Sequence, residues 1–114
     1  MYSNDEKNKR GKIMSKATAI FIGNFGRDPE LGYIPNTQTA VCNFSIATTC
    51  KHKEKEITQW HRCIAFNGAA ETIAKFMKKG SKIYLECRIE YDEYEKDGVK
   101  VKTPKYFVDE FEFC

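Results

Sequence analysis

The chain has 114 residues with a formal net charge of +3, and 41% of the residues are hydrophobic and 31% charged. This length suits one compact domain, and the composition is too apolar and too mixed in charge for a disordered chain. No apolar run approaches the roughly 18 residues that span a bilayer, and the N-terminal residues lack the apolar stretch of a signal peptide, so we expect a cytoplasmic protein.

The charge is unevenly distributed along the chain. Residues 1–16 carry five bases and two acids, whereas residues 17–114 carry fourteen of each. Because residues 1–16 are polar and without periodicity, we expect a flexible basic leader there and one domain over residues 17–114. A neutral domain cannot hold nucleic acid by net charge, so such a function would need a local stripe of bases together with aromatic stacking.

Short β-type runs dominate the domain. Five strands are expected, over residues 18–22, 40–49, 57–66, 82–94 and 106–113. The segment 24–36 contains two glycines and two prolines and is expected to be a long turn-rich connection. The tripeptide 96–98, Lys-Asp-Gly, is expected to form a hairpin tip.

Between the third and fourth strands, residues 69–79 change to a helical period. Ala69, Ile73, Phe76 and Met77 are expected on one helical face, and Gly80 follows as a C-terminal stop. Five strands with one helix between the third and fourth predict a mainly β OB-fold, a small barrel that binds oligonucleotides or oligosaccharides. The fold alone does not name the ligand.

Cysteines and histidines give no sign of a metal site or an active site. The chain has five cysteines, which are Cys42, Cys50, Cys63, Cys87 and Cys114. They form no C-x-x-C pair; three lie in apolar strand patterns and are expected to be buried, whereas Cys50 and Cys114 are expected to be exposed. His52 and His61 have no suitable nucleophile nearby, and no catalytic motif is present. We therefore expect no metal, no cofactor and no enzymatic activity.

The third strand has the most informative pattern. With period two, Trp60, Arg62 and Phe66 share one face, while His61 and Cys63 lie on the other. In one interpretation the two rings stack on bases of single-stranded nucleic acid and Arg62 meets a phosphate. In the other the rings fill the barrel and Arg62 extends outward. The residues alone leave both interpretations open.

The fourth strand weakens the case for binding. Glu86, Glu90 and Asp92 share a face with the basic and aromatic residues of that strand. Acids on this face are expected to repel a phosphate backbone.

Six segments, in the same order, resemble the bacterial single-stranded DNA-binding protein family. They are IGNFGRDPEL (22–31), YIPN (33–36), VCNFSIAT (41–48), WHRCIAF (60–66), KKGSKIYLE (78–86) and VDEFEF (108–113). The resemblance implies an OB-fold that assembles as a homotetramer and binds single-stranded DNA without strong sequence preference. It also implies a role in replication, recombination and repair at the nucleoid.

The resemblance implies roles for individual residues as well. The implied nucleic-acid contacts are Trp60, Phe66, Tyr94, His52, Arg62, Lys78 and Lys79. Tyr94 and His52 stand where the family carries tryptophan, which is expected to reduce stacking. Tyr84 and His61 match positions at subunit contacts.

The sequence also departs from the family. Gly32, Glu90 and Asp92 stand where relatives commonly carry arginine, and the sequence ends where the family continues into a flexible linker and an acidic tip. That tip recruits replication and repair proteins, so these partners are expected only if the natural protein has such a tail. Two alternatives stay open: a primosomal replication protein N type of dimer that assists helicase loading, and an assembly-only OB module without affinity for nucleic acid.

Overall fold

The computed structural model describes residues 15–114, so most of the predicted leader lies outside the described residues. Within the described part, the chain forms six strands and one helix. They are β1 (Thr18–Phe25), β2 (Glu30–Ile34), β3 (Thr39–His52), β4 (Lys55–Phe66), α2 (Asn67–Phe76), β5 (Lys82–Lys96) and β6 (Val99–Phe113). The five predicted strands correspond to β1, β3, β4, β5 and β6, which confirms the mainly β class.

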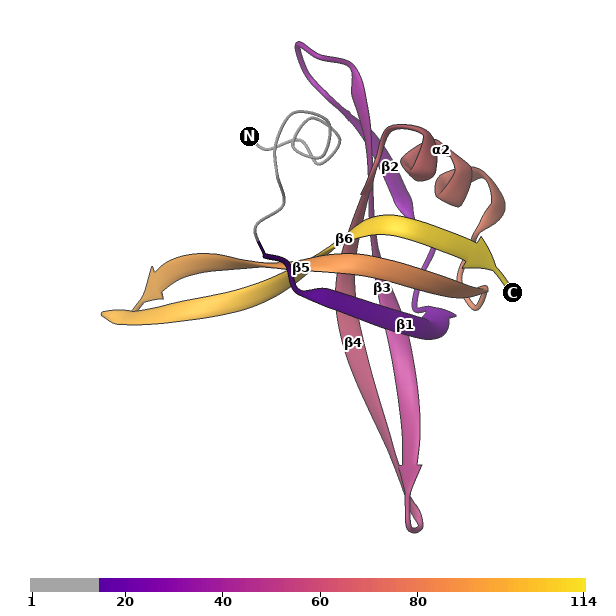
Figure 1. The fold of residues 1–114 in the computed structure, drawn as a ribbon, viewed down its shortest axis with the longest axis vertical. Helices are drawn as coiled ribbons and strands as arrows, with labels where there is room; N and C mark the ends of the chain where they lie inside the picture. Colours follow the sequence, from indigo (N-terminus) through magenta and orange to yellow (C-terminus); the bar gives the residue numbers. More distant parts are fainter. Residues whose placement is uncertain (1–14) are drawn as a thin grey trace.

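Five of the strands close on themselves as a barrel (Figure 1). The pairing runs from β1 to β5, β6, β4 and β3, and β3 returns to β1 at the pairs Asn24↔Ala47 and Phe25↔Ile46. Neighbouring strands are antiparallel except β4 and β6, which are parallel. This order, with the helix between β4 and β5, is that of the predicted OB-fold.

The connection after β1 differs from the prediction. Residues 30–34 form the strand β2, which pairs antiparallel with β3 from Glu30↔Asn43 to Ile34↔Thr39. Gly32 interrupts this short run and prolines flank it, so the local pattern predicted only turns. The partner residues in β3 lie only five to thirteen residues further along the chain, so β2 and β3 form a hairpin that the short, interrupted pattern did not reveal.

Two long hairpins extend away from the barrel (Figure 1). One joins β3 to β4, and the other joins β5 to β6. Asp97 and Gly98 form the tip of the second hairpin with φ angles of 52° and 79°, as a two-residue type I′ turn requires. The predicted hairpin tip is therefore confirmed, although β6 starts seven residues earlier than expected, at Val99 rather than residue 106.

The helix α2 packs on the barrel through Ala70 and Ile73, which are both buried. It ends at Phe76, because Met77 is already extended with φ −104° and ψ 149°. The predicted helical period ran to residue 79, so the helix ends three residues earlier than expected. The side chain of Phe76 is 57% exposed on its last turn. As described, α2 is too short and too polar to cross a membrane.

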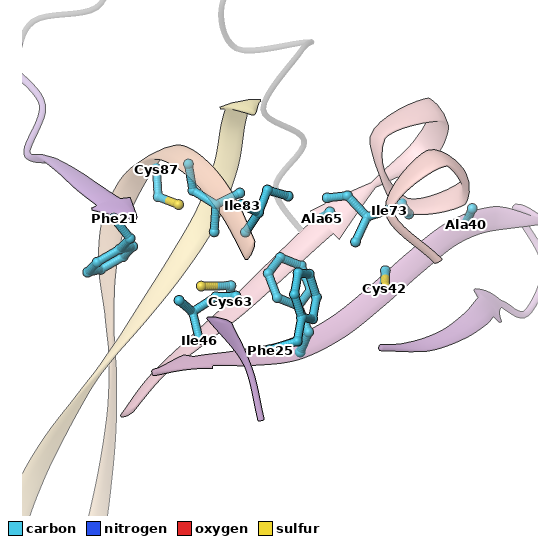
Figure 2. Packing of buried hydrophobic residues seen from close by; sticks show 13 residues of the cluster. Phe21, Phe25, Ala40, Cys42, Ile46, Cys63, Ala65, Ile73, Ile83 and Cys87 are labelled. Atoms are coloured by element: carbon cyan, nitrogen blue, oxygen red, sulfur yellow. The ribbon is translucent and has the colours of Figure 1, made fainter. Parts of the chain in front are cut away.

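Phenylalanine, isoleucine, leucine and three cysteines fill the barrel (Figure 2). Cys42, Cys63 and Cys87 are fully buried, whereas Cys50 and Cys114 are exposed, as predicted. Gly23 lies where β1 passes from β5 to β3, and a Cβ atom there would collide with the backbone of Ala47. Glycine therefore permits the close approach of β1 and β3 that closes the barrel.

Candidate nucleic-acid interface

The strand β4 separates a buried face from an open one. Cys63 and Ala65 are fully buried in the barrel, whereas Trp60 is 61% exposed and Arg62 is exposed beside it. Because successive side chains of a strand point to opposite faces, Trp60 and Arg62 lie together on the outer wall. The interpretation in which Trp60 fills the barrel is therefore wrong.

The indole of Trp60 rests on a glycine turn. A Cβ atom added to Gly26 would collide with the six-membered ring of the indole. The backbone N–H of Gly26 donates to the carbonyl of Ser45 at 3.2 Å, which attaches the turn to β3. Gly26, Arg27, Ser45 and Trp60 line a shallow pocket of about 230 Å³. The ring is thus supported on one side and open elsewhere, as a stacking platform requires.

Phe66 lies at the other end of the same face, and another ring covers it in part. Its ring stacks on Phe107 of β6 with centroids 5.9 Å apart and an interplanar angle of 8°. The guanidinium of Arg88 lies 5.7 Å from the centroid of Phe107. Arg88 also bonds to Glu90 at 3.1 Å and to Asp109 at 3.3 Å. Phe66 therefore belongs to a row of packed side chains and offers less free ring surface than Trp60.

Three acids of β5 lie beside bases. In addition to the pair of Glu90 with Arg88, Asp92 bonds to Lys105, and Glu93 lies 3.9 Å from the ammonium of Lys102. These pairs reduce the repulsion of phosphate that the sequence predicted for Glu90 and Asp92, because each has a positive partner a few ångströms away. Glu86 instead accepts a hydrogen bond from the Tyr84 hydroxyl. Each pair stabilises the fold only slightly, since most of these groups are solvated.

Four other predicted contacts lie outside β4. His52 is at the end of β3, Tyr94 is on the β5–β6 hairpin, and Lys78 and Lys79 are in the segment between α2 and β5; all four are exposed. The structure brings Trp60 and Arg62 together on β4, with Phe66 further along the same strand, and places the other four residues on two hairpins and one loop. An extended polymer can reach such a distribution, whereas a compact ligand cannot.

Comparison with known proteins identifies the family. Residues 16–114 match the family described as the single-strand binding protein family. The chain belongs to that family. Two single-stranded DNA-binding proteins of Neisseria meningitidis, from a serogroup A and a serogroup B strain, are each 42% identical to it over 93 residues. The match covers 76% of this chain and 53% of each relative, so the chain spans about half the length of these curated relatives.

In this member of the single-strand binding protein family, His61 makes its contacts inside the subunit. Its ring stacks on Phe21 with centroids 4.2 Å apart and meets Tyr106 edge-on at 5.9 Å. Its Nε2 atom lies 2.8 Å from the hydroxyl of Thr48. Burial lowers the pKa of His61 below its usual value, because the charged form loses hydration.

Tyr84 lies on the outer wall of the barrel, beside Ile22 of β1. Its hydroxyl donates to the Glu86 carboxylate at 2.7 Å. This hydrogen bond is the main reason that the pKa of Tyr84 is raised, because the bond is lost when the phenol ionises. Glu86, Glu110 and Glu112 surround the phenol, so this part of the wall is acidic.

Two residues of the interface were missed by reasoning from the sequence, namely Gly26 and Arg27. They belong to the segment 22–31 that carries the family resemblance, but nothing local connects them with Trp60.

Within residues 15–114, no group of three or more His, Cys, Asp or Glu side chains is arranged to hold a metal ion.

Proposed function

We propose that the chain binds single-stranded DNA without strong sequence preference, as a non-catalytic coat in replication, recombination and repair. The observation that carries the proposal is the exposed Trp60 ring, held against Gly26 on the outer wall of the barrel next to Arg62. Base stacking on such a ring contributes roughly 1 to 3 kcal/mol per base and tolerates any sequence, because every base has a π-face. The names of the Neisseria relatives support the same function.

The proposed contacts divide into rings and bases. Trp60 is the main platform, Phe66, Tyr94 and His52 are secondary platforms, and Arg62, Lys78 and Lys79 are the phosphate contacts. Phe66 is secondary because Phe107 covers part of its ring. Tyr94 and His52 are secondary because the ring of each is smaller than an indole. Each also lies on one of the two hairpins that extend away from the barrel, His52 on the β3–β4 hairpin and Tyr94 on the β5–β6 hairpin.

The proposed assembly is a homotetramer that uses the outer side of β1. Ile20 and Ile22 are 60% and 56% exposed there, and Ile22 is paired with Tyr84. Along residues 18–23 the described pairings of β1 involve only β5, so the other edge of β1 is open for a second subunit. An open edge with exposed isoleucines is unfavourable in water, which supports its burial between subunits.

Titration with fluorescent oligo(dT) tests the binding. We expect DNA to quench Trp60, the only tryptophan of the chain, and Trp60→Ala to weaken binding by about 1 to 3 kcal/mol with little change in thermal stability. Ile57→Ala is the matched control, because Ile57 is an exposed apolar residue on the opposite face of β4. Equal affinity of Trp60→Ala and the unaltered protein would contradict the proposal.

A further inference from the structure

Phe76 is an exposed aromatic residue that packing within the chain does not explain. Its side chain is 57% exposed at the end of α2, and its ring meets that of Phe113 at a centroid distance of 5.9 Å with an interplanar angle of 56°. The ammonium of Lys75 lies 5.3 Å from the ring centroid. Exposure of this much apolar surface suggests that something covers the ring in the working state.

The charge around Phe76 indicates which kind of partner fits. Residues 75–82 carry four lysines, at positions 75, 78, 79 and 82, and no acid. The domain over residues 17–114 is neutral, so the rest of it carries ten bases against fourteen acids. The lysine segment is therefore the local basic stripe that a neutral domain needs in order to bind a polyanion.

Hydrogen bonds hold the lysine segment against the turn that supports Trp60. The backbone N–H of Lys79 donates to Asp28 Oδ1 at 2.7 Å, and the N–H of Gly80 donates to the Phe25 carbonyl at 2.8 Å. In return, the N–H of Phe25 donates to the Ser81 carbonyl at 2.9 Å. Asp28 is thus engaged with the backbone of the lysine segment.

These contacts bring neighbouring segments together into a surface path. Trp60 lies against Gly26 and shares a pocket with Arg27, Asp28 bonds to the backbone of Lys79, and Phe76 precedes Lys79 by three residues in the chain. In Figure 1 the end of β1, the start of β5, the C-terminus and the end of α2 lie on the same side of the barrel. The bond between the Cys114 N–H and the Lys82 carbonyl, at 3.4 Å, agrees with this arrangement.

We infer that single-stranded DNA continues from Trp60 along this surface, with Arg27 and Lys75 as phosphate contacts and Phe76 as an additional stacking platform. The inference rests on the proposed function. A solvated cation beside a ring is worth about 0.5 to 1 kcal/mol, less than the roughly 1 to 3 kcal/mol of a stacked base. A base therefore displaces Lys75 from the ring, and the freed ammonium pairs with the adjacent phosphate.

A length series of oligo(dT), from about 4 to 16 nucleotides, tests the inference, because this range covers the sites of single OB-folds. We expect Phe76→Ala and Phe76→Leu to bind the shortest oligonucleotides like the unaltered protein and the longer ones at least about fivefold more weakly. Leucine keeps an apolar side chain on α2 but has no π-face. Tyr33→Ala is the matched control, since Tyr33 is a similarly exposed aromatic residue on a different element, β2. Arg27→Gln and Lys75→Gln should reduce the dependence of affinity on salt.

A second measurement does not depend on small differences in affinity. Phe76→Trp in a Trp60→Phe background places the only tryptophan on α2, and long oligonucleotides should quench it whereas the shortest should not. Unquenched emission with long DNA, or full affinity of Phe76→Leu at every length, overturns the inference. If Trp60→Ala still weakens binding in that case, the proposed function stands and only the extension to Phe76 fails.

Discussion

Gly26 supports the ring of Trp60, the main stacking platform of the proposed interface. The residue has no positive φ, so its backbone accepts alanine, but the added Cβ would collide with the indole of Trp60. We expect Gly26→Ala to displace the ring, shift the emission of Trp60 and weaken oligo(dT) binding, with less effect on the melting temperature than on affinity. Fluorescence, titration and thermal melting measure the three effects. Gly68→Ala is the control, because open space surrounds the position where its Cβ would lie. Unchanged emission and affinity in Gly26→Ala would show that Trp60 does not depend on this turn.

His61 makes stability depend on pH. The pKa of His61 is lower in the folded state than the value of about 6.5 in the unfolded chain, so the fold favours the neutral imidazole. The contribution of His61 to the free energy of unfolding is therefore complete above the unfolded pKa, and it is lost as the pH falls through the lower folded pKa. Between pH 7 and pH 5 we expect the melting temperature to decrease. The decrease should be smaller in His61→Gln, which keeps a polar partner for Thr48. His52→Gln is the control, because His52 is the other histidine and lies exposed on a hairpin. An equal decrease in the unaltered protein and in His61→Gln would mean that other groups, such as carboxylates, cause the pH dependence.

At the scale of the element, β1 has different roles on its two faces. Phe21 and Phe25 point into the barrel, whereas Ile20 and Ile22 point outward beside β5. We expect the double substitution Ile20→Thr and Ile22→Thr to keep the fold, because threonine also favours strands, but to lower the assembled mass. Light scattering should give about four times the chain mass of 13.2 kDa for the unaltered protein and less for the variant.

Ile57→Thr is the control for this experiment, since Ile57 is an exposed isoleucine of the β3–β4 hairpin. A stable monomer of the unaltered protein at micromolar concentration would contradict the proposed tetramer. A mass of twice the chain would favour instead the dimer of the primosomal replication protein N type.

For the whole molecule, the balance of charge determines how salt affects binding. Residues 17–114 carry fourteen charges of each sign, and the structure pairs several acids of β5 with bases. For single strands the logarithm of affinity falls with that of salt by about 0.7 per phosphate neutralised. We therefore expect a shallow slope in titrations at increasing salt, with stacking as the main source of affinity. A steep slope, as for a strongly basic binder, would contradict this.

The sequence alone determined those features that depend on neighbouring residues. Period two along residues 57–66 placed Trp60 and Arg62 opposite Cys63, and the Asp97-Gly98 dipeptide identified the hairpin tip. The order of the strands and the position of the helix followed from the same local periodicities. The segments that resemble the family predicted the membership that the comparison confirmed.

Only the tertiary structure decided what depends on residues far apart in the chain. It left Phe76 exposed on the last turn of α2, although the helical period had placed this residue on one face with the buried Ile73. It also placed Trp60 against Gly26 and closed β1 onto β3. Local periodicity reports which face a side chain takes, but not which distant segment meets that face, since that depends on how the whole barrel closes.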